Sequence, residues 1–323
     1  MKESEIRPKE IFNQFLHLAQ KDTETYFRDS PRQKINCPGC NSIGKYTFSK
    51  DSFDYCKCEN CHTLYVNPRP NIESFEDYYT NSPSSKYWAT TFYKETVDVR
   101  REKIWKPKAR MITELLEKEI IDYEIIDIGG GYGIFAEEIQ KINRNPVIII
   151  EPAPHLAEIC RGRGFKVIEK FLEDVSIKDL SKKSKCFVSF ELFEHLHNPE
   201  KFLLNLNSLM KSQDLFIFTT LSGMGLDIQV LMENSPSVSP PHHLNFFNPH
   251  SVKKILERTG FRKIEVCTPG KLDIDILNNN KEKIKDLFWK TFLENSDETQ
   301  KSRWQTLVTE SGWSSHMMVV CNK

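Results

Sequence analysis

An apolar segment followed by a glycine cluster, near the middle of the chain, has the composition of a nucleotide-cofactor site. Residues 123–128 are apolar except for two acids, and they lead into four closely spaced glycines: Gly129, Gly130, Gly131 and Gly133. Phe135, Ile139 and Ile142 then recur at helical spacing. A strand, a glycine turn and a helix start in that order bring free backbone N–H groups close to a bound ligand.

Two acids near the glycines indicate which nucleotide cofactor the site would bind. Asp127 stands two residues before the first glycine, and the glycine spacing departs from the Gly-x-Gly-x-x-Gly of dinucleotide sites. An acid at that place suits a cofactor with a positively charged amino-acid portion, which favours S-adenosylmethionine (SAM) over a dinucleotide. Glu151 ends the next apolar run, about 20 residues past the glycines, where an acid accepts the two ribose hydroxyls.

Two Cys-x-x-Cys pairs upstream have the spacing of zinc ligands. Cys37 and Cys40 form the first pair, Cys58 and Cys61 the second, and strand-like segments lie between them. Four thiolates close the tetrahedral shell of a zinc ion, so we expect a structural zinc ribbon. Cys56 is an alternative ligand to Cys58, with a less suitable Cys-x-Cys spacing. A disulfide framework is the other interpretation, but the sequence shows no signal peptide or secretory context.

The elements that must position these residues alternate regularly along the chain. Strand-like runs at 146–150, 166–169, 185–190 and 214–220 follow the one at 123–128, and helical segments separate them. This alternation predicts an α/β fold with a doubly wound parallel sheet. In such a fold ligands bind at the carboxyl ends of the strands.

Segments along this sheet resemble the successive motifs of class I SAM-dependent methyltransferases. They are Asp127–Gly133, Glu151–Pro152, Phe190–Leu196 and Pro241–Phe247, the last preceding a helix that ends at Thr259, Gly260 and Phe261. The resemblance covers residues 119–323. It implies a Rossmann-like sheet of seven strands that binds SAM through Asp127, the glycines and Glu151. It further implies that the adenine lies near Phe171 and Leu172, and that Phe190 belongs to the cofactor side.

The histidines after the fifth strand are the first candidates for removing a proton from the methyl acceptor. The run 243–247, His-Leu-Asn-Phe-Phe, resembles His-Leu-Ser-Tyr-Phe in sugar C-methyltransferases that also carry an N-terminal zinc module. Pro240, Pro241 and His242 stand where that pattern has Tyr-His-Glu, so O-, N- and C-methylation all stay open. We expect His243 to act as the general base, with His242 second. The structural alternative is a histidine that packs its loop or bonds a backbone carbonyl.

Acids after the fourth strand form a further set of candidates. Glu191 stands nearest the strand end, and we rank it third as a catalytic residue. Glu194 and His195 are expected to begin a helix, where an acid suits the helix dipole.

Changes in composition divide the chain into four parts. They are an N-terminal helical segment (1–34), the zinc ribbon (35–68), an aromatic and basic helical linker (69–118), and the methyltransferase domain (119–323) with insertions near 223–245 and 270–310. We expect the linker's aromatics to join the ribbon to the catalytic domain, with a substrate lid as the alternative. The basic stretch at 100–110 is expected to be a solvated helix face, with binding of a polyanion or a diphosphate as the alternative.

Charge and hydropathy narrow the function. The 323 residues contain 45 Lys and Arg and 45 Asp and Glu, so the formal net charge is zero, which disfavours nucleic acid as the main partner. No apolar run approaches the roughly 18 residues of a membrane span. We expect a cytoplasmic enzyme that methylates a small molecule, such as a sugar or nucleotide-linked sugar of polysaccharide or natural-product biosynthesis. The alternatives are a zinc-ribbon RNA methyltransferase and a non-catalytic binding protein with the SAM fold.

Overall fold

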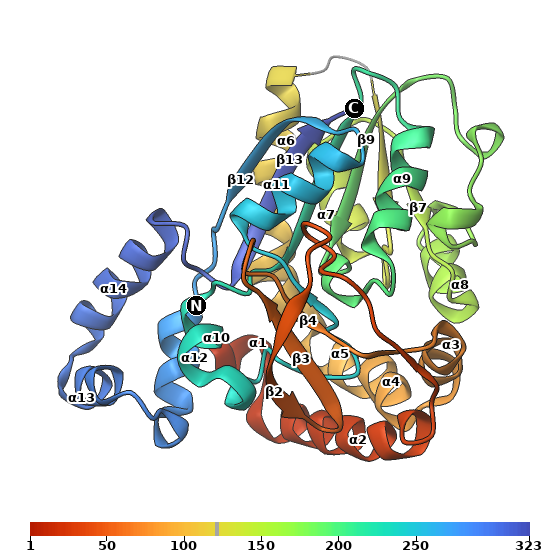
Figure 1. The fold of residues 1–323 in the computed structure, drawn as a ribbon. Helices are drawn as coiled ribbons and strands as arrows, with labels where there is room; N and C mark the ends of the chain where they lie inside the picture. Colours follow the sequence, from red (N-terminus) through yellow and green to blue (C-terminus); the bar gives the residue numbers. More distant parts are fainter. Residues whose placement is uncertain (120–122) are drawn as a thin grey trace.

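A seven-stranded sheet forms the centre of the computed structural model, which describes residues 1–119 and 123–323 (Figure 1). Its strand order is β12 (Arg262–Cys267), β13 (His316–Asn322), β10 (Leu215–Leu221), β9 (Ser184–Phe190), β6 (Tyr123–Ile128), β7 (Val147–Ile150) and β8 (Lys166–Ile168). The strands β6 to β10 pair in parallel, whereas β13 pairs antiparallel with both neighbours. The doubly wound α/β fold is therefore confirmed, and the five strands predicted from apolar runs are β6 to β10.

Helices cover both faces of this sheet, because its strands are apolar on both sides. One face packs against α6 (Lys106–Glu119), α7 (Ile134–Ile142) and α8 (Pro154–Gly162). The other face packs against α9 (Pro199–Leu209) and α11 (Pro249–Arg258). Of the helical stripe predicted after the glycines, Phe135 and Ile139 are buried but Ile142 is exposed, because α7 ends there.

A second sheet belongs to the ribbon, and its fourth strand comes from a distant part of the chain. Its order is β11 (Asn245–Phe246), β4 (Leu64–Val66), β3 (Phe53–Cys58) and β2 (Gly44–Lys50), all antiparallel. A two-stranded pair of β1 (Arg32–Gln33) and β5 (Arg69–Pro70) closes the base of the ribbon. Because β11 begins two residues after His243, the ribbon is attached to the segment that carries the predicted base.

The N-terminal helices wrap around the ribbon at one end of the large sheet (Figure 1). They are α1 (Glu3–Ile6), α2 (Lys9–Phe27), α3 (Ile72–Asn81), α4 (Pro83–Tyr87) and α5 (Tyr93–Arg100). Two π-helical turns, Trp88–Phe92 and Arg101–Trp105, join α4, α5 and α6 into one run. Aromatic side chains from α2, β3 and α3 form the core beneath the ribbon, so Phe75 and Tyr78 do join it to the rest of the molecule.

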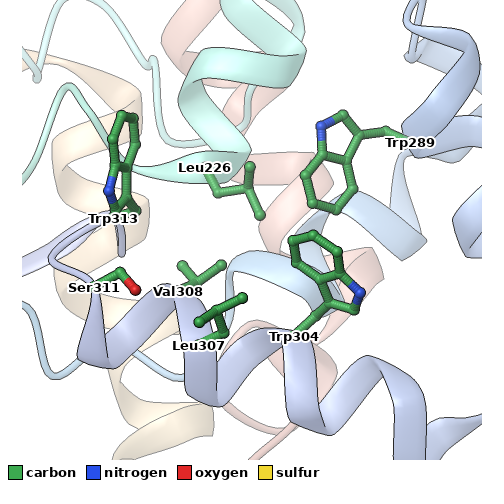
Figure 2. A pocket seen from close by; sticks show the side chains of 7 residues that line it. All are labelled: Leu226, Trp289, Trp304, Leu307, Val308, Ser311 and Trp313. Atoms are coloured by element: carbon green, nitrogen blue, oxygen red, sulfur yellow. The ribbon is translucent and has the colours of Figure 1, made fainter.

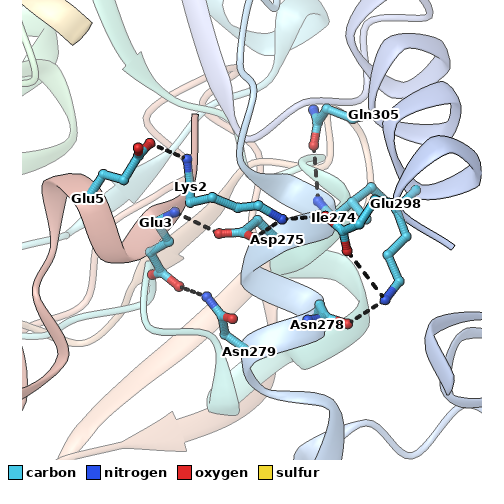
Figure 3. A network of polar contacts seen from close by, with 10 residues as sticks. Lys2, Glu3, Glu5, Ile274, Asp275, Asn278, Asn279, Glu298 and Gln305 are labelled. Atoms are coloured by element: carbon cyan, nitrogen blue, oxygen red, sulfur yellow. Dashed lines mark hydrogen bonds and ion pairs between the residues drawn. The ribbon is translucent and has the colours of Figure 1, made fainter. Parts of the chain in front are cut away.

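A small helical unit, formed by the two predicted insertions, packs beside the N-terminus. It contains α10 (Leu226–Leu231), α12 (Asp273–Asn279), α13 (Leu287–Asn295) and α14 (Glu298–Glu310). Figure 3 shows how polar contacts attach α1 to it: the Glu3 backbone N–H donates to Asp275 at 2.6 Å, and Lys2 Nζ pairs with Glu298 at 2.6 Å. Among the described residues, no helix has the length and apolarity that crossing a bilayer requires.

Candidate active site

The glycine loop between β6 and α7 adopts a conformation that only glycine takes without strain. Gly129, Gly131 and Gly133 all have positive φ, at 71°, 54° and 69°. At Gly130 a Cβ would lie 2.7 Å from the Ile149 side chain, so the loop packs tightly against β7. A Cβ at Gly131 would meet nothing within 4 Å, so the loop has open space on that side.

Asp127 lies at the carboxyl end of β6 and is the least solvated acid of the loop. Only 2% of its surface is exposed, and its Oδ2 atom is buried without a hydrogen-bond partner. Burial, with a smaller contribution from the charge of Glu151, raises the pKa of Asp127 to about 7. A buried carboxylate oxygen without a donor is costly, so this atom calls for a cationic or N–H-bearing ligand.

Glu151 follows β7 and is fixed against the glycine loop. Its carboxylate accepts hydrogen bonds from the backbone N–H of Gly131 at 2.9 Å and of Ala153 at 3.0 Å. Burial raises the pKa of Glu151 even though these two bonds act to lower it. Two acids at the ends of adjacent strands therefore flank the open side of the loop.

The remaining residues predicted on the cofactor side differ in their exposure. Phe171, after β8, is 58% exposed and free to stack on a ligand, whereas Leu172 belongs to the hydrophobic core. Phe190 is also buried, and its ring centroid lies 4.5 Å from that of Phe135.

An aromatic pair covers the glycine loop. This contact was not predicted from the sequence. Tyr132 of the loop stacks on Tyr93 of α5 with ring centroids 4.1 Å apart and planes 9° apart. The Tyr132 hydroxyl also donates to the backbone carbonyl of Ala89. Part of the aromatic linker therefore lies over the cofactor loop, while Phe75 and Tyr78 stay in the ribbon core.

Glu191 stands at the end of β9 in a strained conformation, with φ of 54°. Its carboxylate accepts a hydrogen bond from the Thr219 hydroxyl at 2.6 Å and lies 3.6 Å from Lys108 Nζ and 3.5 Å from His316 Nδ1. Burial acts to raise the pKa of Glu191, but His316, Lys108 and Thr219 together lower it to about 2. The carboxylate is therefore ionised and already engaged with a cation.

His243 and His242 lie together after β10, but each has a different partner. His243 Nδ1 donates to the Ser237 carbonyl at 2.7 Å, so its Nε2 atom is the one that remains available. His242 Nε2 forms a 2.7 Å hydrogen bond with the Tyr78 hydroxyl. Burial lowers the pKa of His243 well below its ordinary value, and burial with the charge of His195 lowers that of His242 to about 3. Both imidazoles are neutral at pH 7.

Glu194 and His195 do not cap a long helix but join His243. They lie in a short 3-10 turn, Phe193–His195, and α9 begins only at Pro199. The ligand-capable atoms of Glu194, His195 and His243 all lie within 4.8 Å of one another. From the sequence, Glu194 and His195 were expected to have a structural role at the start of a helix. Their contact with His243 could not be predicted, because it depends on a loop about 50 residues away.

The segment that carries Glu191 lies next to the glycine loop. A Cβ at Gly129 would lie 3.1 Å from Leu192, the residue after Glu191. Lys108, which pairs with Glu191, also faces Asp127 closely enough to lower its pKa. Leu192 and Lys108 therefore place Glu191 beside the glycine loop and Asp127.

The family of the chain follows from its sequence over this region. Residues 98–266 match the family described as "Methyltransferase domain", which is more than half of the chain and includes β6 to β10 and both histidines. The chain belongs to the methyltransferase-domain family. It is a SAM-dependent methyltransferase with the seven-stranded sheet of that class.

Solved structures with similar folds include several methyltransferases at low identity. A SAM-dependent methyltransferase from Archaeoglobus fulgidus is 16% identical, with 72% of this chain and 100% of that chain covered at a TM-score of 0.47. The plantazolicin methyltransferase BpumL, solved with SAH, is 11% identical, with 76% and 93% covered at 0.49. An O-methyltransferase of a polyketide synthase from Brevibacillus brevis, solved with S-adenosylhomocysteine, is 14% identical, with 71% and 77% covered at 0.46. Comparison with curated proteins gave no match.

The ribbon of this methyltransferase holds the histidine segment in place. The Tyr55 hydroxyl donates to the backbone carbonyl of His243 at 2.9 Å. Arg69 is 2% exposed, and its guanidinium donates to the carbonyl of His197 at 2.6 Å and to the side chain of Asn245 at 2.8 Å. One buried arginine thus ties the segment after β9 to the segment after β10.

The four predicted zinc ligands converge in the ribbon. The sulfur atoms of Cys37 and Cys61 lie 3.4 Å apart, as do those of Cys40 and Cys58, and all four lie within 4.8 Å of one another. Thiolates about 2.3 Å from one zinc ion would lie about 3.8 Å apart, so the cluster fits zinc with small adjustments. Cys56 lies outside the cluster, with its sulfur near the Asn67 carbonyl, so the choice between Cys56 and Cys58 falls on Cys58.

The basic stretch at 100–110 is not a uniformly solvated face of the methyltransferase. Arg101 forms ion pairs with Glu137 and Glu138, and Lys108 is buried beside Glu191. Arg101 and Lys108 therefore form their ion pairs with acids of the same chain.

A separate apolar pocket of about 270 Å³ opens in the helical unit formed by α10, α13 and α14 (Figure 2). Its lining includes Trp289, Trp304 and Trp313, and almost all of it is hydrocarbon. It contains no acid, histidine or cysteine. This pocket therefore offers no carboxylate, imidazole or thiol for proton transfer.

Proposed function

We propose that this methyltransferase transfers the methyl group of SAM to a small-molecule acceptor, a sugar or nucleotide-linked sugar of polysaccharide or natural-product biosynthesis. The observation that carries the cofactor part is the buried Oδ2 atom of Asp127, which has no partner. An ammonium group is the donor that would satisfy it, and SAM carries one.

The glycine loop and its two acids fit SAM in shape and charge. Asp127 would bind the methionine ammonium, and Glu151, already fixed by two backbone N–H groups, would accept the ribose hydroxyls. The open space at Gly131 leaves room for the ligand to approach the backbone. Phe171 is exposed at the end of the neighbouring strand, where it would cover the adenine. Bound SAM would supply a methyl group on a positively charged sulfur, ready for in-line displacement.

On the acceptor side, we assign the removal of the acceptor's proton to His243. Its Nδ1 atom is bound to a backbone carbonyl, so the tautomer leaves a lone pair on Nε2. His242 is second, because its Nε2 atom is already bound to Tyr78. Glu191 is third, because its carboxylate is already paired with Lys108.

Arg100, which lies close enough to Glu191 to act on its pKa, supports an anionic acceptor such as a nucleotide-linked sugar. The buried Nε atom of Arg100 has no hydrogen-bond partner, whereas the Nη1 atom of Arg7 lies 3.6 Å from Glu3 Oε1 in an ion pair. Burial lowers the pKa of Arg100, and the neighbouring charge of Arg7 lowers it further, so the two guanidiniums repel one another. A diphosphate beside Arg100 would relieve this repulsion and accept its free Nε–H group.

We also propose that Cys37, Cys40, Cys58 and Cys61 bind one structural zinc ion. Four thiolates leave no open coordination position, so the ion stabilises the ribbon and takes no part in methyl transfer.

The test of the proposed function is a transfer assay with SAM labelled in its methyl group and a panel of nucleotide-linked sugars. The expected result is label on one class of sugar nucleotide and stoichiometric SAH. Label on RNA, with none on any sugar nucleotide, would overturn the substrate assignment. Elemental analysis of the same protein is expected to find zinc. If the freshly purified protein contained no metal, the zinc assignment would be overturned.

A further inference from the structure

The cluster of Glu194, His195 and His243 has the composition of a second metal site. Among the described residues, only this group and the cysteine cluster bring three or more ligand-capable side chains so close together. Glu194 is buried, and both histidines are half-buried, so the cluster is shielded but reachable from the acceptor side. Two imidazoles and one carboxylate are a ligand set that divalent transition metals use.

The neighbours of this cluster orient its ligands. The Ser237 carbonyl accepts the Nδ1 proton of His243, which leaves the Nε2 atom of that ring free to bind a metal ion. The Thr220 hydroxyl donates to Glu194 Oε2 at 2.9 Å and holds that carboxylate in place. A backbone carbonyl behind a histidine and a hydroxyl behind a carboxylate are the outer contacts that metal ligands show.

Hydrogen bonding within the cluster does not explain why the three side chains converge. In the described part of the chain, no hydrogen bond joins any two of the side chains of Glu194, His195 and His243. Their ligand atoms nevertheless lie within 4.8 Å of one another. Ligands about 2.1 Å from one tetrahedral ion lie about 3.4 Å apart, so atoms within 4.8 Å of one another close on a cation by approaching up to about 1.4 Å through side-chain rotations.

We propose that Glu194, His195 and His243 bind one divalent transition-metal ion, such as Mn²⁺ or Zn²⁺, whose open positions take an oxygen of the methyl acceptor. This proposal rests on the proposed function and deepens it, because it names a hydroxyl or a pair of neighbouring hydroxyls as the acceptor group. Imidazole ligands favour these ions over Mg²⁺ and Ca²⁺, which prefer oxygen.

In this arrangement the cation takes over the task assigned to His243 as a base. A hydroxyl bound to a divalent cation is more acidic, and its proton leaves to solvent water. The resulting alkoxide oxygen forms a bond to the methyl carbon, while the carbon–sulfur bond breaks and its electron pair stays on sulfur. The products are the methyl ether and SAH. His243 is then a metal ligand, and its loss removes turnover just as the loss of a base would.

Mn²⁺ separates this site from the cysteine cluster, since thiolates prefer zinc and Mn²⁺ prefers oxygen and nitrogen. The experiment is a titration of the zinc-loaded protein with Mn²⁺, in which electron paramagnetic resonance measures the bound Mn²⁺. We expect one Mn²⁺ per chain, with at least tenfold weaker binding in Glu194→Gln and in His195→Ala. His250→Ala, at an exposed histidine on α11, is the matched control and should bind Mn²⁺ like the parent.

SAM binding by each variant shows whether the variant has folded. Thr220→Val, which removes only the hydroxyl behind Glu194, offers a milder test and should weaken Mn²⁺ binding about 10–100-fold. No Mn²⁺ binding by the parent, or equal binding by folded Glu194→Gln, would overturn the metal site. If the parent binds no Mn²⁺ but His243→Ala still loses turnover, the metal proposal fails and the direct base stands. If the parent binds Mn²⁺ but transfers no methyl group from SAM, the proposed function fails instead.

Discussion

The two sides of the proposed active site are built in opposite ways. The cofactor side comes from neighbouring strands and their loops: Asp127 and Glu151 end β6 and β7, and the glycine loop connects β6 to α7. The acceptor side is assembled from the segment after β9, the segment after β10, the ribbon and the N-terminal helices. One side can form wherever the sheet forms, whereas the other requires several distant segments to dock correctly.

This difference shows where the specificity of such an enzyme can change. The cofactor side depends on backbone geometry and two acids, so it tolerates little variation. The acceptor side depends on contacts such as those of Tyr55 and Arg69 with the histidine segment. Loss of the ribbon should therefore damage turnover while leaving the cofactor site nearly intact.

The largest expected effect comes from breaking the ribbon. Cys40→Ser removes one of four zinc ligands, and structural zinc contributes about 10–16 kcal/mol of apparent binding energy to small modules. We expect loss of zinc, loss of ribbon structure and a fall in turnover to background, because β11 and His243 lose their support. SAM affinity, measured by calorimetry, should change by less than about threefold.

Cys267→Ser, at an exposed cysteine on β12, is the matched control and should keep both zinc and turnover. If Cys40→Ser kept full turnover after losing its zinc, the acceptor side would not depend on the ribbon.

His243→Ala removes the central residue of the acceptor side. General-base catalysis contributes about 10²–10⁴-fold, and turnover should fall by that amount at saturating substrate. Calorimetry should find unchanged SAM affinity, because His243 lies outside the glycine loop. A parallel loss of SAM affinity would mean that the two sides are not separable.

Asp127→Ala removes the buried acid of the cofactor side. Loss of a hydrogen bond to a charged group costs about 1.5–3 kcal/mol, so SAM affinity should fall at least tenfold. The ribbon should keep its zinc, which elemental analysis of the same sample would check. Unchanged SAM affinity in this variant would remove Asp127 from the cofactor site.

The pH dependence of SAM binding gives the smallest effect. The pKa of Asp127 is raised to about 7 in the SAM-free protein, so the carboxyl is increasingly protonated as the pH falls below 7. SAM's ammonium pairs with the ionised form, whose fraction falls about tenfold between pH 8 and pH 6. Affinity should therefore fall about tenfold over this interval and level off above pH 8. The Asp127→Asn variant should bind weakly with little pH dependence, and an equally steep profile in that variant would assign the titration to another group.

Most of the cofactor side was predictable because its signals are local. A strand, an acid and a glycine turn follow one another between residues 123 and 133, and the structure places all of them at one edge of the sheet. The clustering of the four cysteines was predictable for the same reason, since each pair comes from one short turn. Leu172 shows the limit of this reasoning, because an apolar residue at a strand end can face either the ligand or the core.

The acceptor side was predictable only in part. His243 and Glu191 were recognised from motifs, but the link between His243, Glu194 and His195 depends on how two loops meet. Pairing of β11 with the ribbon strand β4 joins residues about 180 positions apart, and no local pattern encodes it. The burial of Lys108 within a basic stretch likewise depends on Glu191, which comes from another element.

The most direct test of the two-sided site is a crystal structure of the chain with bound SAH. We predict that the ammonium of SAH lies within hydrogen-bond distance of Asp127 and that Glu151 accepts the ribose hydroxyls. The sulfur should face the side formed by Glu191 and His243. SAH bound elsewhere, or with its sulfur turned away from these two residues, would contradict the account.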